Sequence, residues 1–180
     1  METSLLEKAA LLFFRTMITR VIGPGLKELA DQQLTQVQLA CMRFVYLHPD
    51  PSVGEIANGL AISNAAAAKL IDRLVKRAIL IREEDQTDRR VLKIKLTPAG
   101  RLLLETFIAT ETQQFEKIIR KMPPEAVNSL QEGLTAFLAA ALVTPEEINA
   151  ICLKCGWDHT FNCPGNLRYY QLTGRNRDQG

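Results

Sequence analysis

Three cysteines and a histidine lie close together near the C-terminal end of the 180-residue chain. They are Cys152, Cys155, His159 and Cys163, with the spacing C-x2-C-x3-H-x3-C. Two cysteines separated by two residues direct their sulfurs toward one point. A histidine and a third cysteine close behind complete the four soft or borderline ligands that tetrahedral zinc takes. The spacing therefore predicts a metal site in residues 144–180, built from all four side chains.

Two other chemistries fit the same residues. Three close cysteines followed by Cys163-Pro164 are similar to segments that bind an iron–sulfur cluster, and such a cluster would sense redox state, oxygen or iron. Without a metal, Cys152 and Cys155 form a C-x-x-C pair that can cycle between thiols and a disulfide. Structural zinc is the favoured interpretation, and the iron–sulfur cluster and the redox pair stay open.

The sequence shows no catalytic constellation. It has no serine, histidine and aspartate set and no phosphate-binding loop, and a metal held by four protein ligands leaves no position for a substrate. We therefore expect no enzyme. The remaining cysteine, Cys41, lies among Leu39, Ala40 and Met42 and is expected in the core.

Composition excludes several classes of protein. Hydrophobic residues make up 47% of the chain and charged residues 23%, which is globular composition. The longest uninterrupted apolar run, residues 136–143, is far shorter than the roughly 20 residues that span a bilayer. No small-residue cleavage site follows the apolar residues near the N-terminus. We expect a cytoplasmic protein without membrane attachment.

The positive charge of the chain is concentrated in one segment. Residues 63–97 carry nine basic and five acidic side chains, whereas the whole chain has a formal net charge of only +2. Such a local excess is typical of a nucleic-acid contact. A solvated helix face followed by a charged hairpin would give the same pattern.

Capping residues predict the helices that carry this segment. Thr35 can cap a helix that runs to about residue 48, and Ser52 with Glu55 fits a capping box that opens a short helix through about residue 60. Ser63 can cap a further helix from Asn64 to about residue 77. Two short helices joined by three or four residues form the helix-turn-helix pattern.

The spacing of apolar residues changes from a helical period to a period of two after the helix-turn-helix. Leu92, Ile94 and Leu96 alternate with lysines, which predicts a strand with one buried face. Residues 79–84 are expected to pair with it across the polar loop 85–90, where Asp85 and Asp88 can bond the turn backbone. A charged β-hairpin directly after a helix-turn-helix makes a winged helix.

Helices are predicted on both sides of the winged helix. Residues 4–22 form a helix that is apolar nearly all round, which a partner subunit would cover. The Gly-Pro-Gly at residues 23–25 is expected to end it. Residues 98–121 and 125–142 are two more helices, separated by Pro123-Pro124, and residues 167–180 are expected to be a frayed terminus.

Residues 4–143 resemble the MarR family of bacterial transcriptional regulators. The resemblance rests on the order of helices and on three segments, LTQVQLACMRFVYLHP (34–49), SVGEIANGLAISNAAAAKLIDRLVKRAIL (52–80) and REEDQTDRRVLKIKLTPAG (82–100). It implies a mainly α fold with a small β component. A winged helix-turn-helix DNA-binding domain in residues 34–97 would be flanked by dimerisation helices in residues 1–33 and 98–143, and residues 144–180 would be an added Cys/His tail.

The resemblance also implies function. Family members are homodimers that bind palindromic double-stranded DNA, mostly as repressors released by a small-molecule effector or an oxidant. The helix from Asn64 would enter the major groove and the wing an adjacent minor groove. The DNA contacts would come from Ser63, Asn64, Lys69, Arg73 and, in the minor groove, Arg89. Arg90 would support the wing by pairing with Asp72, together with Asp85 and Asp88.

The sequence departs from the family pattern in two places. Ala65, Ala66 and Ala68 stand where the family often has serine or threonine, so direct readout falls to Ser63, Asn64 and Lys69. The first helix lacks the reactive cysteine of the peroxide-sensing branch. The alternative function is a winged helix that serves as a protein-interaction module with a structural zinc knuckle.

Overall fold

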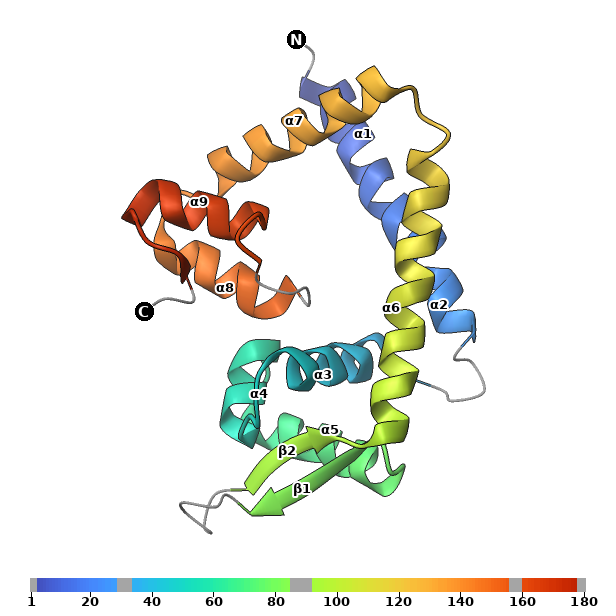
Figure 1. Ribbon diagram of the computed structural model, residues 1–180, viewed down its shortest axis with the longest axis vertical. Coiled ribbons are helices and arrows are strands. Elements are labelled where there is room, and N and C mark those ends of the chain that lie inside the picture. The colour runs from blue at the N-terminus through green and yellow to red at the C-terminus, as the bar shows by residue number, and fades with distance from the viewer. Residues whose placement is uncertain (1–2, 29–33, 85–91, 156–159, 178–180) are drawn as a thin grey trace.

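The computed structural model describes residues 3–28, 34–84, 92–155 and 160–177. The described chain is mainly helical with one two-stranded sheet, so the predicted fold class is confirmed (Figure 1). The elements are α1 (Thr3–Thr16), η1 (Met17–Ile22), α2 (Gly23–Glu28), α3 (Gln36–Leu47), α4 (Val53–Leu60), α5 (Asn64–Lys76), β1 (Leu80–Glu84), β2 (Leu92–Leu96), α6 (Pro98–Ile119), α7 (Pro124–Ala141), α8 (Pro145–Cys155) and α9 (Pro164–Thr173).

The predicted caps begin the helices of the winged domain. Thr35 opens α3 and Ser52 opens α4, each in a complete capping box. The Ser63 hydroxyl accepts a hydrogen bond from the Ala66 N–H at 3.2 Å and so begins α5. Thr97 opens α6 in the same way, with the Gly100 N–H at 2.9 Å. Each cap satisfies a backbone donor that the first helical turn leaves without a partner.

Strands β1 and β2 form the predicted antiparallel hairpin. Leu80 pairs with Leu96 and Glu84 with Leu92. Leu80 and Ile94 are fully buried, whereas the other residues of β1 are exposed. The Ile94 N–H donates to the carbonyl of residue 51 at 3.0 Å, which joins the hairpin to the start of α4.

One hydrophobic core unites α3, α4, α5, the hairpin and the first half of α6. Close packing within the helix-turn-helix depends on Gly59 of α4, because a Cβ there would lie 2.0 Å from the ring of Phe44. Cys41 is fully buried, as the sequence predicted. The largest fully buried side chains of this core are Met42, Ile56, Ile71, Leu74, Leu80, Ile94 and Leu104.

The Gly-Pro-Gly segment does not end the first helix, contrary to the sequence prediction. The chain stays helical from Thr3 to Glu28 through a π-helical turn, η1, in which the Gly23 N–H donates to the Ile18 carbonyl. A proline inside an α-helix clashes with the carbonyl four residues earlier, and the wider π turn relieves such conflicts. Gly25 then packs directly against the ring of Phe107 in α6.

The described part of the C-terminal segment, residues 167–177, is not frayed, which is a second correction. Residues 164–173 form α9, and the Arg168 Nε donates to the Leu142 carbonyl at 2.9 Å. The Asn166 amide donates to the Phe161 carbonyl at 3.1 Å and accepts from the Arg177 N–H at 2.9 Å. Side chains of α7, α8 and α9 make a second small core, composed of Leu142, Ile148, Cys152, Leu138 and Tyr169.

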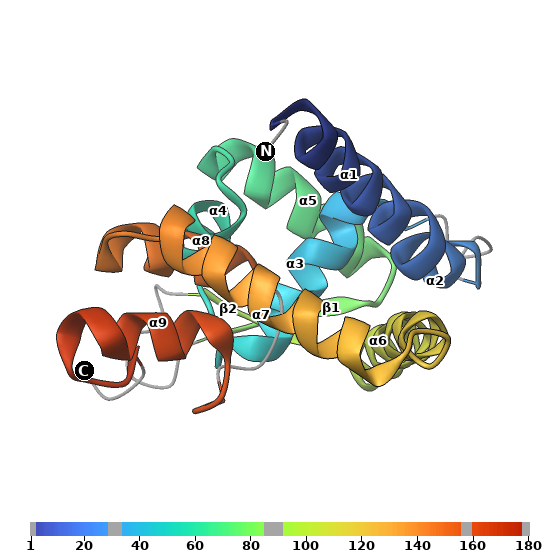
Figure 2. The ribbon, with the colours of Figure 1, turned by 90° about the horizontal axis from the view of Figure 1, so that it is seen from above.

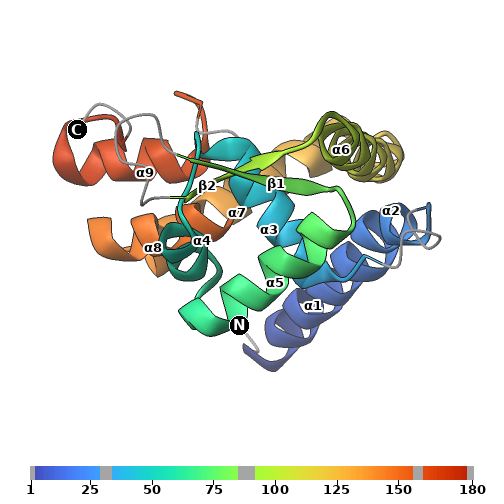
Figure 3. The same ribbon diagram turned by 90° about the horizontal axis from the view of Figure 1, so that it is seen from below.

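The long helix α6 connects the two ends of the molecule. The winged domain lies at one end and α1 and α7 lie toward the other, with α8 and α9 on the side opposite α6 (Figure 1). Seen from above, α7 crosses over α3 and runs from α6 toward α8 and α9 (Figure 2). Seen from below, α5 and the hairpin lie at the end of the molecule remote from α7 (Figure 3).

Candidate nucleic-acid interface

Helix α5 and its N-cap carry those predicted DNA-binding residues that the structure describes. Ser63, Asn64, Lys69 and Arg73 are all exposed. The opposite face of the helix is buried in the core through Ala67, Leu70, Ile71 and Leu74. The buried positions fix the rotation of the helix, so Lys69 and Arg73 point outward together. Ser63 and Asn64 are exposed because they stand at the N-terminal end of the helix. Lys69 and Arg73 form no ion pair with any other described residue.

The alanines of α5 have three different surroundings. Ala65 and Ala66 are exposed beside Asn64, Ala68 is half-buried and Ala67 is fully buried. The first turn of the helix therefore offers methyl groups and one amide. Methyl groups can contact the methyl of thymine but cannot bond a base edge, so Asn64 and Ser63 are the hydrogen-bonding groups of this turn.

An ion pair attaches the wing to α5. Arg82 of β1 bonds Asp72 of α5, with 2.5 Å between Nη2 and Oδ1. The sequence prediction gave Asp72 this supporting role with Arg90 as its partner, and the structure supplies Arg82. Arg89, Arg90, Asp85 and Asp88 lie outside the described residues, so their roles stay predictions.

The strands of the wing are themselves linked by charge. Lys95 of β2 lies 2.9 Å from the Glu83 carboxylate of β1 and 3.5 Å from that of Asp50. The hydrogen bond with Glu83 raises the pKa of Lys95 above its usual value. Lys95 is thereby engaged within the wing, and the basic surface next to it comes from α5.

The comparisons with known proteins agree with this arrangement. Residues 34–92 match the model of the MarR family. The chain is 27% identical over 139 residues to the HTH-type transcriptional repressor MdtR of Bacillus subtilis, which covers 77% of this chain and 88% of MdtR.

The chain is similar to the MarR family across its winged domain.

Solved structures share its fold. The structure of RV1404 from Mycobacterium tuberculosis superposes with a TM-score of 0.66 at 23% identity, covering 78% of this chain and 95% of that one. The structure of Streptococcus pneumoniae FabT in complex with DNA gives 0.62 at 19% identity, covering 74% and 92%. Members of the MarR family are transcriptional regulators and not enzymes, which agrees with the prediction from sequence.

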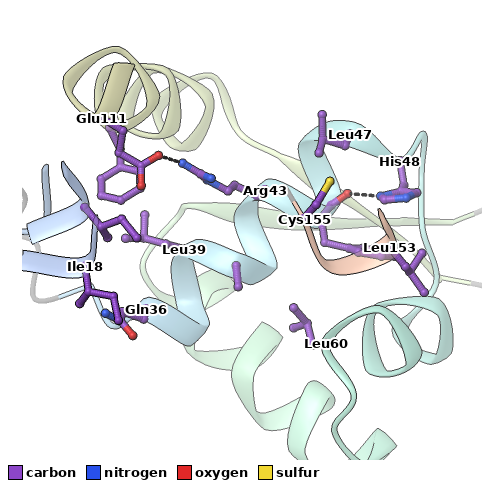
Figure 4. A pocket seen from close by; sticks show the side chains of 14 residues that line it. Ile18, Gln36, Leu39, Arg43, Leu47, His48, Leu60, Glu111, Leu153 and Cys155 are labelled. Carbon is purple, nitrogen blue, oxygen red and sulfur yellow. Dashed lines mark hydrogen bonds and ion pairs between the residues drawn. The ribbon is translucent and has the colours of Figure 1, made fainter. Parts of the chain in front are cut away.

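The structure has a cavity between the winged domain and the flanking helices. The cavity measures about 240 Å³ and opens between η1, α3, α6 and the end of α8 (Figure 4). Its polar lining includes Arg43, Glu111, His48 and Cys155. Its apolar lining includes Ile18, Ile22, Leu39, Phe44, Leu60, Phe107 and Leu153.

Sequence reasoning missed the ion pair in this cavity. Arg43 of α3 bonds Glu111 of α6, and the guanidinium also stacks over the ring of Phe107 at 5.3 Å (Figure 4). Burial lowers the pKa of Arg43, and the nearby Cys155 thiol acts in the opposite direction. Arginine inside the otherwise apolar run of α3 was the available signal, but only the fold identifies Glu111 as its partner.

The structure brings together two of the four predicted metal ligands. A Cβ on Gly165 would stand 2.6 Å from the Cys152 sulfur and 3.8 Å from the Cys163 sulfur, so both sulfurs lie around one point. Cys155 lines the cavity with Arg43, and it also acts on the Cys152 thiol electrostatically. No three His, Cys, Asp or Glu side chains gather to hold a metal ion in the part of the chain that is described. His159 lies outside that part, and the metal site stays a prediction.

The flanking helices expose a large apolar surface. Helix α7 has no buried residue, and Phe137 on it is 68% exposed. The stretch Ser4–Lys27 is long and apolar enough to cross a membrane by length and composition, with only 11% of it buried. One such helix does not by itself indicate a membrane protein, because other kinds of helix meet the same test of length and composition. Exposed apolar side chains on α1 are Leu5, Leu6, Leu11, Leu12, Phe13 and Phe14.

Proposed function

We propose that this chain is a dimeric repressor that binds a palindromic operator through α5 and the wing. The observation that carries the proposal is the exposed surface of α5 beside a wing attached by Asp72 and Arg82. Ser63 and Asn64 are exposed at the N-terminal end of this helix, and Lys69 and Arg73 are exposed on its outer side. The structures of FabT and of a variant of MepR, both bound to nucleic acid, belong to proteins of the same fold and support this use of the surface.

Each residue has a role that its chemistry suits. Asn64 carries both a donor and an acceptor and stands at the first turn of α5, where it can bond an adenine edge in the major groove. Ser63 accepts the Ala66 N–H through its oxygen and keeps its own proton to donate. Lys69 and Arg73 lie further along the helix on its outer side and would neutralise phosphate charge. Arg89 would enter the neighbouring minor groove from the wing.

A second copy of the chain would cover the exposed apolar residues of α1 and α7. Apolar surface of this extent is unusual on a monomer and marks an interaction site. A two-fold dimer would place two α5 helices about one turn of DNA apart, roughly 34–36 Å, which is why a palindrome is expected.

The proposal includes repression of transcription and its control by a small molecule. MdtR, a relative at 27% identity, is described as a repressor. The cavity between α3 and α6 would take a small apolar effector, because its lining is largely apolar and the charges of Arg43 and Glu111 compensate each other. An effector held there contacts both the winged domain and α6, so it can change the spacing of the two α5 helices. Because such a repressor acts on genomic DNA, we expect the protein in the cytoplasm.

The metal centre of the tail remains part of this proposal as a structural element. Cys152, Cys155, His159 and Cys163 would hold zinc or, alternatively, an iron–sulfur cluster. Metal and acid-labile sulfide analysis on protein purified without air distinguishes the two. One zinc per chain in a colourless solution indicates a structural site, and iron with sulfide indicates a redox sensor.

The test of DNA binding is selection of duplexes from fragmented genomic DNA by the full-length chain, followed by mobility-shift assays. We expect one recurring palindrome, with affinity reduced at least tenfold by Asn64→Ala or Arg73→Ala. Lys121→Ala is the matched control, since Lys121 is an exposed cation beyond the far end of α6. The control variant should bind like the wild type. If no duplex is enriched, the winged helix serves as a protein-interaction module instead.

A further inference from the structure

The C-terminal tail supplies part of the wall of the cavity between the winged domain and α6. Leu153 and Cys155, at the end of α8, line this cavity together with residues of η1, α3, α4 and α6. The alignments with RV1404 and FabT span 95% and 92% of those chains but only 78% and 74% of this one. The resemblance to the MarR family ends at residue 143. This wall therefore comes from a segment that this chain adds to the shared fold.

Leu153 faces the cavity because of its place on α8. Ile148 and Cys152 lie four residues apart on one face of this helix, and both are buried in the small core with α7 and α9. Leu153 is one residue further along, so it is turned by roughly 100° about the helix axis. It packs against the core of the winged domain instead. Figure 4 shows Leu153 and Ile18 at opposite ends of the cavity lining.

Hydrogen bonds fix the direction in which α8 leaves α7. The Glu147 carboxylate accepts from the N–H groups of Val143 and Thr144, at 2.9 and 3.1 Å. The Thr144 hydroxyl accepts from the Glu147 N–H at 3.2 Å, which completes a capping box. Arg168 of α9 bonds the Leu142 carbonyl at the end of α7. Leu153 is thus positioned both from α7 and from the winged domain, as the wall of a ligand site must be.

We propose that Leu153 is a specificity-determining residue of the effector cavity and sets the length of the apolar ligand that the cavity takes. This role rests on the effector cavity proposed above and adds the tail to it. The charges of Arg43 and Glu111 compensate each other and the rest of the lining is largely apolar, so the ligand is of the neutral apolar class. A ligand that lies along the cavity from the Ile18 end meets Leu153 at the other end.

A purely structural role for Leu153 predicts a different behaviour. Removing a leucine that only anchors the tail lowers stability, but it leaves the relation between ligand length and affinity unchanged. Removing a wall residue lengthens the cavity, so longer ligands bury more apolar surface and bind more tightly. A larger side chain at residue 153 has the opposite effect. The dependence of affinity on ligand length therefore separates the two roles.

The test uses the full-length chain and the neutral fluorescent probe N-phenylnaphthylamine, displaced by straight-chain primary alcohols from butanol to decanol. The alcohols differ only in length, so their affinities measure the length of the cavity. We expect the affinity of the wild type to rise with chain length up to a limit. Leu153→Ala should bind the alcohols beyond that limit about tenfold more tightly than the wild type. Leu153→Trp should move the limit to a shorter alcohol.

Two further variants complete the design. Ile151→Ala is the matched control and should bind the alcohols like the wild type, since Ile151 lies on the same helix but is 53% exposed and does not line the cavity. Leu60→Ala enlarges the cavity from α4, which belongs to the winged domain, and should also raise the affinity for longer alcohols. None of these substitutions removes a side chain of the predicted metal site.

A wild-type length limit in Leu153→Ala would overturn the proposal, and a lower Tm in that variant would then assign Leu153 to anchoring the tail. If Leu60→Ala shifts the limit while Leu153→Ala does not, the effector cavity exists without a wall from the tail. If neither the wild type nor Leu153→Ala binds the probe, the cavity takes no apolar ligand and the proposal also fails. These measurements contain no DNA, so failure to select an operator duplex would overturn the repressor proposal and leave the result on Leu153 standing.

Discussion

Arg43 of α3 and Glu111 of α6 form an ion pair with side-chain exposures of only 14% and 7%, and it joins the winged domain to the long helix. Removing one partner leaves a buried charge uncompensated. Glu111→Ala should lower the free energy of unfolding by about 3–5 kcal/mol in urea denaturation. Arg43→Met/Glu111→Leu should recover most of that loss, because both charges are then absent.

Glu116→Ala is the control for this prediction. It breaks a pair with Arg120 on the same helix whose side chains are 52% and 78% exposed. An exposed pair of this kind contributes about 0.5 kcal/mol or less. Equal stability of Glu111→Ala and Glu116→Ala would show that the Arg43 pair is solvated and does not hold α3 to α6.

The pair between Asp72 and Arg82 should matter for DNA binding more than for stability. Both side chains are partly exposed, at 48% and 32%, so Asp72→Asn should change unfolding by less than about 1 kcal/mol. Affinity for the operator should fall because the wing is no longer held to α5. The charge-swapped variant Asp72→Arg/Arg82→Asp should restore part of the affinity, and wild-type binding by Asp72→Asn would remove this pair from the interface.

The salt dependence of operator affinity reports how many cationic side chains contact phosphate. Arg73→Ala should reduce the slope of log affinity against log salt concentration by about one unit. The slope is measured by fluorescence anisotropy with the operator duplex. Lys121→Ala should leave it unchanged, since that side chain lies beyond the other end of α6. Identical slopes for the two variants would place Arg73 away from the DNA.

A charged side chain in place of Phe137 on α7 should prevent the chain from forming a dimer. Phe137 is 68% exposed in the single chain, and Phe137→Glu would bury a carboxylate at the proposed interface. Sedimentation velocity should then show a monomer that no longer binds the palindrome. Ile151→Glu on α8 changes a similarly exposed apolar residue, at 53%, and should stay dimeric. A dimeric Phe137→Glu variant would move the interface elsewhere.

Cys41 should be unreactive in the folded protein. Burial raises the pKa of its thiol from 9.0 to about 12, so the neutral form is favoured in the native state. Its contribution to stability is present below pH 9.0 and is lost as the pH rises toward about 12. Alkylation at pH 8 should modify Cys163 and spare Cys41 until denaturant is added, and Cys41→Ala should show a smaller loss of stability at alkaline pH. Equal labelling of both cysteines in native protein would contradict this account.

The sequence predicted those parts of the fold that local chemistry determines. Ser52, Ser63 and Thr97 cap helices because a side-chain oxygen meets a nearby N–H, and this depends on only a few neighbouring residues. The period of two around Ile94 predicted the strand for the same reason.

Other features depend on packing between distant segments and could not be predicted this way. Pro24 stays within a helix because the π turn before it relieves the clash and α6 packs against Gly25. Helix α9 forms although its sequence is polar, because Tyr169 completes a small core and Asn166 bonds the chain on both sides. Cys163 meets Cys152 only through the docking of α8 on α9.

The most direct test of the account is a hydroxyl-radical footprint of the full-length chain on a duplex that it selects from genomic DNA, with the mass of the complex measured in parallel. We expect two symmetric protected segments about one helical turn apart and two chains per duplex. Asn64→Ala should remove the protection. Uniform weak protection that ignores sequence, or a single chain on a single half-site, would contradict a dimer that reads a palindrome with α5.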